Sequence, residues 1–280
     1  MTTSTQDNPI DIYIIGTGMV GYTQLTREAE NALQASERVY LLDGQPMVEN
    51  HIKETYTEDV VMLNREYNEG EDRVATYDRM SEEVLKGATE VDGPITFALY
   101  GHPMIFVNPS RSVIRQGREQ GLNVEVQPGI SAIDCVYSDI AFDPAANGVQ
   151  MFEATDLLLR EWELNPEVPA MIWQVSVVET DRHTEKRSKE SRFTRFKEYL
   201  QNFYPEDHTG YLLQTATYPI AESQRHEFEI SNLEEMAPIL DKGYYILHLP
   251  PINERDLQNE ELLQEVRSED HLEEITVRDN

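Results

Sequence analysis

Cysteine and long apolar runs are scarce in this sequence. Its 280 residues contain one cysteine, Cys135, which excludes an internal disulfide and a cysteine-based metal site and fits a reducing, cytoplasmic setting. The longest apolar runs, such as residues 11–15 and 244–249, are only a few residues long, so no transmembrane helix is expected. The N-terminus also lacks the basic and apolar regions that form a signal peptide.

Positive charge is scarce as well. The chain has 23 Lys+Arg against 52 Asp+Glu, a formal net charge of −29, and only 6 of its cations are lysines. Nucleic-acid binding needs a basic face, which this balance excludes. Long-range repulsion disfavours a polyanionic substrate, although one local arginine cluster would overcome it. A very acidic, lysine-poor chain is typical of a cytosolic protein in high salt, where the repulsion between carboxylates is screened.

The apolar pattern predicts an α/β protein with two domains. In the first half, β-rich runs alternate with helical patterns, which favours a parallel sheet; the runs are residues 11–15, 38–43, 95–100 and 123–127. After a Pro-, Gly- and Asn-rich break near 141–150, the expected elements are strands at 170–178, 210–213 and 243–249, an exposed polar loop at 181–190 and a helix at 191–203. The expected units are a disordered tail (1–9), an N-terminal domain (10–145), a C-terminal domain with a mixed sheet (146–253) and a partly helical acidic tail (254–280).

A glycine-rich loop follows the first expected strand. Gly16, Gly18 and Gly21 have the G-x-G-x-x-G spacing, a helical pattern follows from about residue 23, and Asp43 ends the next strand 22 residues after Gly21. This arrangement is the fingerprint of a dinucleotide site, with the acidic residue on a ribose hydroxyl. Glycines at these positions also serve a tight turn between a strand and a helix, so both interpretations stay open at this point.

Three further motifs follow in order: FALYGHP at 97–103, VQPGISA at 126–132 and FEA at 152–154. Together with the glycine loop, they resemble the tetrapyrrole methylase superfamily, whose members use S-adenosylmethionine. The resemblance extends from about residue 11 to 251. It implies two α/β domains with the cofactor in the cleft between them. It also disfavours an NAD(P) dehydrogenase, because that interpretation would leave LYGHP and PGISA unexplained.

The motif LYGHP, together with PGISA and FEA, is similar to the motifs of the borosin branch, whose enzymes N-methylate backbone amides of a ribosomal peptide. That branch carries Tyr, Arg and Tyr spaced six and four residues apart, and Tyr67, Arg73 and Tyr77 have this spacing. The chain ends in EITVRDN without an apolar core after Pro251, so it resembles the split type, in which the precursor peptide is supplied in trans. The resemblance also implies a homodimer.

The chemistry of an amide explains why such residues are needed. Its nitrogen is a poor nucleophile because the lone pair is delocalised into the carbonyl group. Methylation therefore places negative charge on the amide oxygen, which hydrogen-bond donors stabilise, and requires a base for the proton. Arg73 and Tyr77 are four residues apart on one helix face. We therefore expect Tyr77 to be the base, tuned by Arg73, and Tyr67 and Tyr100 to hold the amide oxygen; no metal is needed.

The resemblance also indicates which residues line the cofactor cleft. Those expected to contact S-adenosylmethionine are Gly16, Gly18, Tyr100, His102, Met104, Ile105, Phe106, Ser131, Ala132 and Gln174. Ser131 and Ala132 are expected at a helix N-terminus, and Gln174 in the strand of the second domain. Two alternatives to a peptide N-methyltransferase stay open: a tetrapyrrole methyltransferase of corrin or sirohaem synthesis, and a non-catalytic peptide-binding member of the fold.

Overall fold

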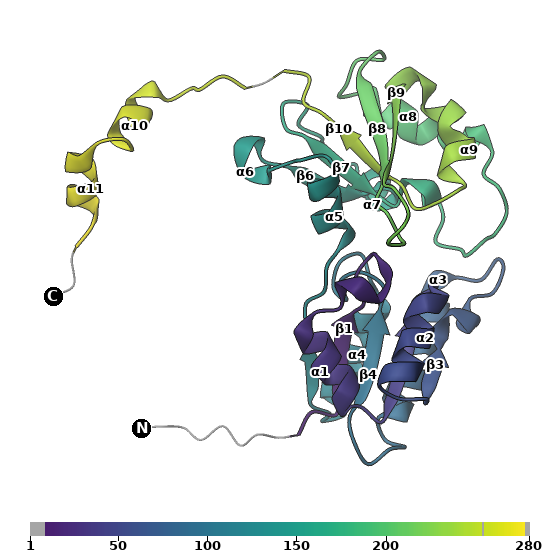
Figure 1. Ribbon diagram of the computed structural model, residues 1–280. Helices are drawn as coiled ribbons and strands as arrows, with labels where there is room; N and C mark the ends of the chain where they lie inside the picture. The colour runs from purple at the N-terminus through teal and green to yellow at the C-terminus, as the bar shows by residue number, and fades with distance from the viewer. Residues whose placement is uncertain (1–8, 254, 278–280) are drawn as a thin grey trace.

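The computed structural model describes residues 9–253 and 255–277, which form two five-stranded sheets with helices around them (Figure 1). The first sheet has the order β3-β2-β4-β1-β5 and all its paired strands are parallel. Its strands are β1 (Ile12–Gly16), β2 (Arg38–Leu42), β3 (Val60–Met62), β4 (Ile95–Leu99) and β5 (Val124–Val126). Because all five run in one direction, the loops that follow them meet at one edge, which faces the second sheet (Figure 1).

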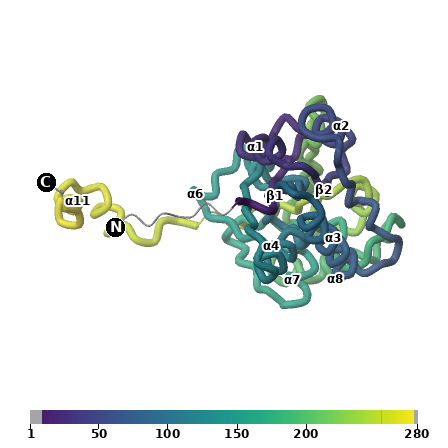
Figure 2. The backbone as a smooth tube through the Cα atoms, turned by 90° about the horizontal axis from the view of Figure 1, so that it is seen from below, coloured from purple at the N-terminus to yellow at the C-terminus, as the bar shows by residue number. Residues whose placement is uncertain are grey.

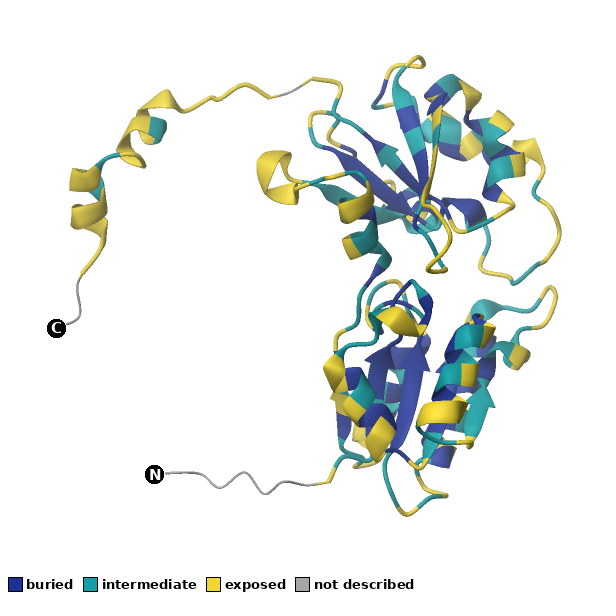
Figure 3. Cartoon of the chain, viewed as in Figure 1, coloured by how far each residue is buried: buried dark blue, intermediate teal, exposed yellow. Residues whose placement is uncertain are grey.

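Helices cover both faces of the first sheet. They are α1 (Arg27–Ala35) and α2 (Pro46–Thr55) on one face, and α3 (Arg73–Gly87) and α4 (Pro109–Glu119) on the other. The alternation of strand β1 accounts for this: Ile12 and Ile14 pack toward α3 and α4, whereas Ile15 packs toward α1 and α2. Figure 3 shows the resulting buried strands between partly exposed helices.

The second sheet is mixed, with the order β6-β7-β10-β8-β9. Its strands are β6 (Gln150–Glu153), β7 (Ala170–Trp173), β8 (Thr209–Gln214), β9 (Gln224–Glu229) and β10 (Ile246–Leu249). Strands β6 and β7 pair in parallel, and the other neighbours pair antiparallel. One face packs on α7 (Ala154–Arg160), α8 (Thr194–Leu200) and α9 (Ala237–Leu240), and the other on α5 (Ala132–Asp139).

Beyond the sheets lie α6 (Pro144–Asn147) and two C-terminal helices, α10 (Glu260–Glu265) and α11 (Glu269–Ile275). Figures 1 and 2 show α10 and α11 extending away from both sheets. The acidic tail is thus partly helical, as predicted, whereas the predicted disordered tail lies, apart from Pro9, outside the described residues. Within the described residues, no helix is long and apolar enough to span a membrane.

The predicted fold class is confirmed, with one parallel and one mixed sheet. Several element predictions were wrong. Strands β3, β6 and β9 were not predicted, because they are short or carry polar residues on exposed positions. The strand expected at 170–178 ends at Trp173, where the backbone of Gln174 turns left-handed with φ 59°. The domain boundary at residue 145 stays a prediction, and α5, on its N-terminal side, packs against the second sheet.

Candidate active site

The three loop motifs meet at the carboxyl edge of the first sheet. The backbones of Gly16, Gly101 and Gly129 pack so closely that a Cβ on Gly16 would lie 2.1 Å from the carbonyl oxygen of Gly101 and 3.0 Å from Cα of Gly129. Gly18 and Gly101 also pair, because the amide of Gly101 donates to the carbonyl of Gly18 at 2.9 Å. Only glycines allow this contact, which brings the ends of β1, β4 and β5 to one point.

The glycine loop does not present a dinucleotide site. The side-chain oxygen of Gln24 accepts hydrogen bonds from the amides of Met19 and Val20, at 2.7 and 3.0 Å, so these donors are not free for a pyrophosphate. Asp43 is buried, and its carboxylate accepts from the Thr17 hydroxyl and the Gln45 amide, both at 2.8 Å. Burial raises the pKa of Asp43, and each of its carboxylate oxygens already accepts a hydrogen bond from the protein itself.

The YGHP turn orders a histidine and a tyrosine beside these glycines. The amide of Met104 donates to Nδ1 of His102 at 3.0 Å, so a neutral His102 carries its proton on Nε2 and can donate from there. Tyr100 is half-buried, and burial and the neighbouring Asp43 raise the pKa of its hydroxyl. Tyr100 therefore stays protonated near neutral pH and is a hydrogen-bond donor.

Two strained residues lie where the two sheets approach each other. Phe106, two residues after Met104, has φ 53°, and Gln174 has φ 59°. The ring of Phe106 stacks on Trp173 with centroids 5.1 Å apart and 26° between the planes, so the loop after the YGHP turn contacts the end of β7. The side-chain amide of Gln174 makes no hydrogen bond to any described residue. Left-handed non-glycine residues are strained, and they occur often at active sites and ligand-binding sites.

The PGISA turn ends at the N-terminus of α5, as predicted. Ser131 is the N-cap, and its hydroxyl donates to the carboxylate of Asp134 at 2.6 Å while the Asp134 amide donates back at 3.3 Å. This capping box occupies the Ser131 side chain, which is buried. Ala132, the first helical residue, adds only its backbone and methyl group, so any contact with a cofactor here is through the backbone of this turn.

The tyrosine–arginine cluster forms where β3 leads into α3. Tyr67 and Tyr77 meet edge to face, with ring centroids 6.5 Å apart and planes at 87°. Arg73 is the first residue of α3, after the N-cap Asp72, and Tyr77 lies one turn further on. A cation at a helix N-terminus is electrostatically unfavourable, which argues for a role of Arg73 outside helix stability.

The environment keeps Tyr67 protonated. Burial and the adjacent Tyr77 hydroxyl raise the pKa of Tyr67 well above its ordinary value, and the charge of Arg73 acts in the opposite direction. Tyr67 is therefore a donor near neutral pH, and the cation beside it favours any negative charge that appears next to the two rings. Within the described residues, no hydrogen bond or ring contact joins Tyr100 to this cluster; its strand β4 lies two strand spacings from β3, about 10 Å.

A second arginine, which the sequence did not reveal, lies near Arg73. Arg192 donates from Nε to the Val178 carbonyl at 2.8 Å and from Nη1 to the Ser188 hydroxyl at 2.9 Å, while its Nη2 is buried without a partner in the described part of the chain. Burial and the charge of Arg73 lower the pKa of Arg192. Neither guanidinium forms an ion pair with a described carboxylate, which is unexpected in so acidic a protein.

A segment of the second domain completes this cluster. Residues 181–186, which we call the strap, pair with residues 69–73: the Arg73 amide donates to the Asp181 carbonyl, and the amides of Gly70 and His183 donate to His183 and Glu71, at 2.8–2.9 Å. The His183 ring lies against the Tyr67 ring with centroids 4.9 Å apart. The sequence predicted residues 181–190 to be an exposed polar loop, and nothing in its residue pattern predicts this pairing with residues 69–73.

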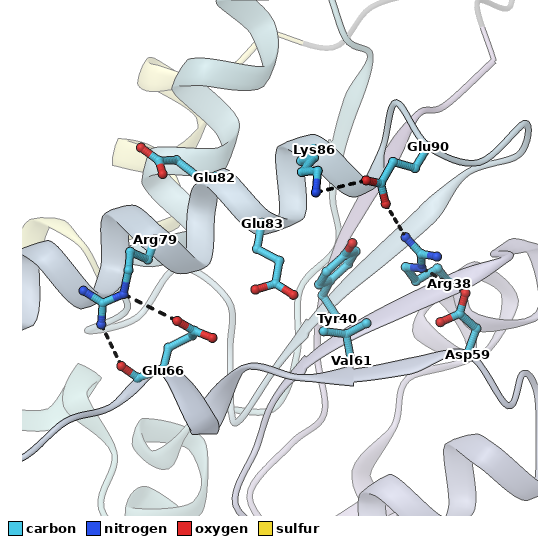
Figure 4. Close-up of a pocket in the computed structure, with 10 residues that line it drawn as sticks. All are labelled: Arg38, Tyr40, Asp59, Val61, Glu66, Arg79, Glu82, Glu83, Lys86 and Glu90. Carbon is cyan, nitrogen blue, oxygen red and sulfur yellow. Dashed lines mark hydrogen bonds and ion pairs between the residues drawn. The ribbon is translucent and has the colours of Figure 1, made fainter.

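An open pocket of about 630 Å³ lies elsewhere, between α3 and strands β2 and β3 (Figure 4). Its cations are paired with acids: Arg38 contacts Asp59 and Glu90, and Arg79 contacts Glu66. The pocket is therefore a solvated, ion-paired surface and holds none of the predicted site residues. Among the described residues, no group of three or more His, Cys, Asp or Glu side chains is placed to hold a metal ion.

Comparison with known proteins agrees with this geometry. The family model for Tetrapyrrole (Corrin/Porphyrin) Methylases matches residues 11–229. The chain therefore belongs to the tetrapyrrole (corrin/porphyrin) methylases. The crystal structure of uroporphyrin-III-C-methyltransferase from Thermus thermophilus superposes with a TM-score of 0.56 at 17% identity, over 86% of this chain and 91% of that one, which supports the fold.

Two curated proteins are similar to this chain over most of its length. The methyltransferase/ribosomally synthesized cyclic peptide dendrothelin A precursor of Dendrothele bispora is 30% identical over 93% of this chain and 62% of its own length. The methyltransferase/ribosomally synthesized type I borosin cyclic peptide precursor of Gymnopilus junonius is 30% identical over 89% of this chain and 59% of its own. The chain thus spans about three fifths of the length of these relatives.

Proposed function

We propose that this protein transfers methyl groups from S-adenosylmethionine to backbone amide nitrogens of a ribosomally made precursor peptide supplied in trans. The observation that carries the proposal is the cluster of Tyr67, Arg73 and Tyr77, in which two phenols adjoin an arginine without an ion-pair partner among the described residues. Curated relatives at 30% identity, named as methyltransferases and cyclic peptide precursors, support the substrate class.

The residues present fit the cofactor. The contact of Gly16, Gly101 and Gly129 leaves no side chain at the loop ends, so a ligand can approach the backbone there. Nε2 of His102 and the amide of Gln174 supply polar groups without described partners beside this point. S-adenosylmethionine would supply a methyl group on a positively charged sulfur, and the strongly negative net charge of the chain suits a cationic ligand.

The chain's own residues account for the proton and the charge. Tyr77 takes the amide proton on its hydroxyl oxygen, and Arg73, one helical turn before it on α3, places positive charge beside it. As the N–H bond breaks, negative charge moves to the amide oxygen, to which Tyr67 and Tyr100 donate because burial keeps both protonated. The nitrogen then accepts the methyl group, and the proton on Tyr77 passes to water. Arg192 adds positive charge beside Arg73.

Two experiments test this function. Isothermal titration at high salt with S-adenosylmethionine and, separately, NAD⁺ should show micromolar binding of the sulfonium alone. When the protein is incubated with a separate candidate peptide and S-adenosylmethionine, the mass of the peptide should then rise in steps of about 14 Da, one CH₂ for each peptide-bond nitrogen methylated. Binding of NAD⁺ alone would contradict the methylase site, and mass steps on the protein itself would contradict supply in trans.

A tetrapyrrole methyltransferase is the second candidate. The observation that favours it is the pair of guanidinium groups, Arg73 and Arg192, since tetrapyrrole precursors carry many carboxylates. Two cations are few for such a substrate in a chain of net charge −29, which is why the peptide is preferred. Visible absorbance distinguishes the two, because a bound tetrapyrrole perturbs its own spectrum and a peptide does not absorb there.

A further inference from the structure

Trp173 has a polar atom that the protein itself does not satisfy. The side chain ends strand β7 and is 5% exposed. Its indole nitrogen Nε1 is buried and has no hydrogen-bond partner within the described residues. Indole nitrogens in protein interiors normally donate a hydrogen bond, and an orphaned buried donor destabilises the fold. A group from outside the described chain is therefore the natural acceptor.

The surroundings of Trp173 indicate where that group lies. Trp173 packs with Val136 of α5, Leu213 and Ile246, on the face of the second sheet that α5 covers. Its ring stacks on Phe106, which follows the YGHP turn and is 42% exposed. The next residue, Gln174, is left-handed, as is Phe106. The indole thus joins the two segments, one from each sheet, that are expected to line the cofactor cleft.

We propose that the indole N–H of Trp173 donates a hydrogen bond to a ring nitrogen of the adenine of bound S-adenosylmethionine, with Phe106 as the ring that shifts to admit it. This inference rests on the proposed function. The environment favours adenine over the carboxylate of the cofactor, because the neighbours of Trp173 are apolar and aromatic, and a charged carboxylate costs more to bury among them than a neutral ring does.

The chain offers a clean spectroscopic test, since it has only two tryptophans. In Trp162→Phe, which removes a 49% exposed indole, Trp173 is the single tryptophan and gives one indole N–H signal. Adding S-adenosylhomocysteine should shift that proton signal downfield and change the tryptophan emission. An indole signal and emission that stay unchanged at saturating S-adenosylhomocysteine would overturn the proposal, whether or not a Trp173 variant folds.

A second measurement removes the donor itself. Trp173→Phe keeps an aromatic ring against Phe106, and its calorimetric dissociation constant for S-adenosylhomocysteine should rise about fivefold to tenfold, the effect of one hydrogen bond. Trp162→Phe is the matched control and should bind as the wild type does. 5′-Methylthioadenosine, which has the adenine but no carboxylate, should lose affinity by the same factor. Loss for S-adenosylhomocysteine alone would overturn the adenine assignment.

The same titrations separate this inference from the proposed function. If the wild-type protein binds neither S-adenosylhomocysteine nor S-adenosylmethionine, the methylase function itself is wrong. If the wild type binds and Trp173→Phe binds equally well, with an unmoved indole signal, only the role of Trp173 is wrong.

Discussion

Replacing Gly16 by alanine tests whether the three loops must meet. The added Cβ would lie 2.1 Å from the Gly101 carbonyl oxygen, and Cβ atoms essentially never approach another heavy atom within 3.0 Å. The two backbones must therefore separate by about 0.9 Å, the difference between these distances. Neither neighbour is the end of a flexible side chain, so the strain spreads into β1 and β4, which are central strands of the first sheet.

The expected effect follows from the cost of overpacking. Forcing a methyl group into a filled site costs about 1–3 kcal/mol and occasionally more, and a backbone clash belongs at the upper end. For a domain of this size, about 3 kcal/mol lowers the melting temperature by roughly 6–12 °C. The assay is thermal unfolding followed by circular dichroism, together with the calorimetric affinity for S-adenosylhomocysteine, which should weaken as the loops separate.

A matched control lies at the same edge of the sheet. Gly44 follows β2, and a Cβ there meets only the Asn64 side chain at 3.5 Å, an ordinary contact. Gly44→Ala should therefore shift the melting temperature little, with at most about 1 kcal/mol of stabilisation through the unfolded chain. If Gly16→Ala melted within error of Gly44→Ala, the argument that backbone contact sets this site would be refuted.

Three further predictions concern the base, acid stability and salt. Tyr77→Phe should lower the methylation rate by about 10²–10⁴-fold with unchanged affinity for S-adenosylhomocysteine, because it removes only the proton acceptor; equal turnover in Tyr77→Phe and a Tyr199→Phe control would contradict this. The pKa of His248 is lowered from 6.5 to about 4 by burial and by the charge of Arg225, so His248 binds its proton at a lower pH in the folded state than in the unfolded chain. The stability that neutral His248 provides is complete above pH 6.5 and is lost as the pH falls toward 4, by up to about 3 kcal/mol. In urea titrations, His248→Gln should lose less stability than the wild type over that range, and parallel losses would count against the assignment. Because the net charge is −29, the protein should melt at a higher temperature in 1 M than in 0.1 M KCl, where screening is weaker; a lower melting temperature would exclude charge repulsion as the dominant effect.

The strap gives the candidate site a dependence on both domains. Glu69 accepts from the Thr184 hydroxyl and the Glu185 amide, both at 2.8 Å, and the Arg182 side chain donates to the Gly70 carbonyl at 2.8 Å. These contacts hold the segment that carries His183 against Tyr67. Movement of one sheet relative to the other would therefore shift the residues of the cluster that contains Arg73.

Much of the fold follows from local patterns. The apolar run at 11–15 predicts strand β1, and α3 begins at Arg73 because Asp72 caps it by accepting hydrogen bonds from the amides of Val74 and Ala75. The short strand β3 escaped prediction because its three residues are only half-buried at the sheet edge. The left-handed turn at Gln174 also escaped, since the apolar run continues past it to Val178.

The sequence by itself determined the three glycine turns, the spacing that places Arg73 and Tyr77 on one helix face, and seven of the ten described strands: β1, β2, β4, β5, β7, β8 and β10. These features are local, because hydrophobic period, capping and turn chemistry act over a few residues. Only the tertiary structure decided that Asp43 and Gln24 accept hydrogen bonds from the Thr17 hydroxyl and the Met19 amide of the glycine loop. It alone brought Arg192 near Arg73 and Trp173 onto Phe106, because such contacts join residues far apart in the chain and depend on how the two sheets pack.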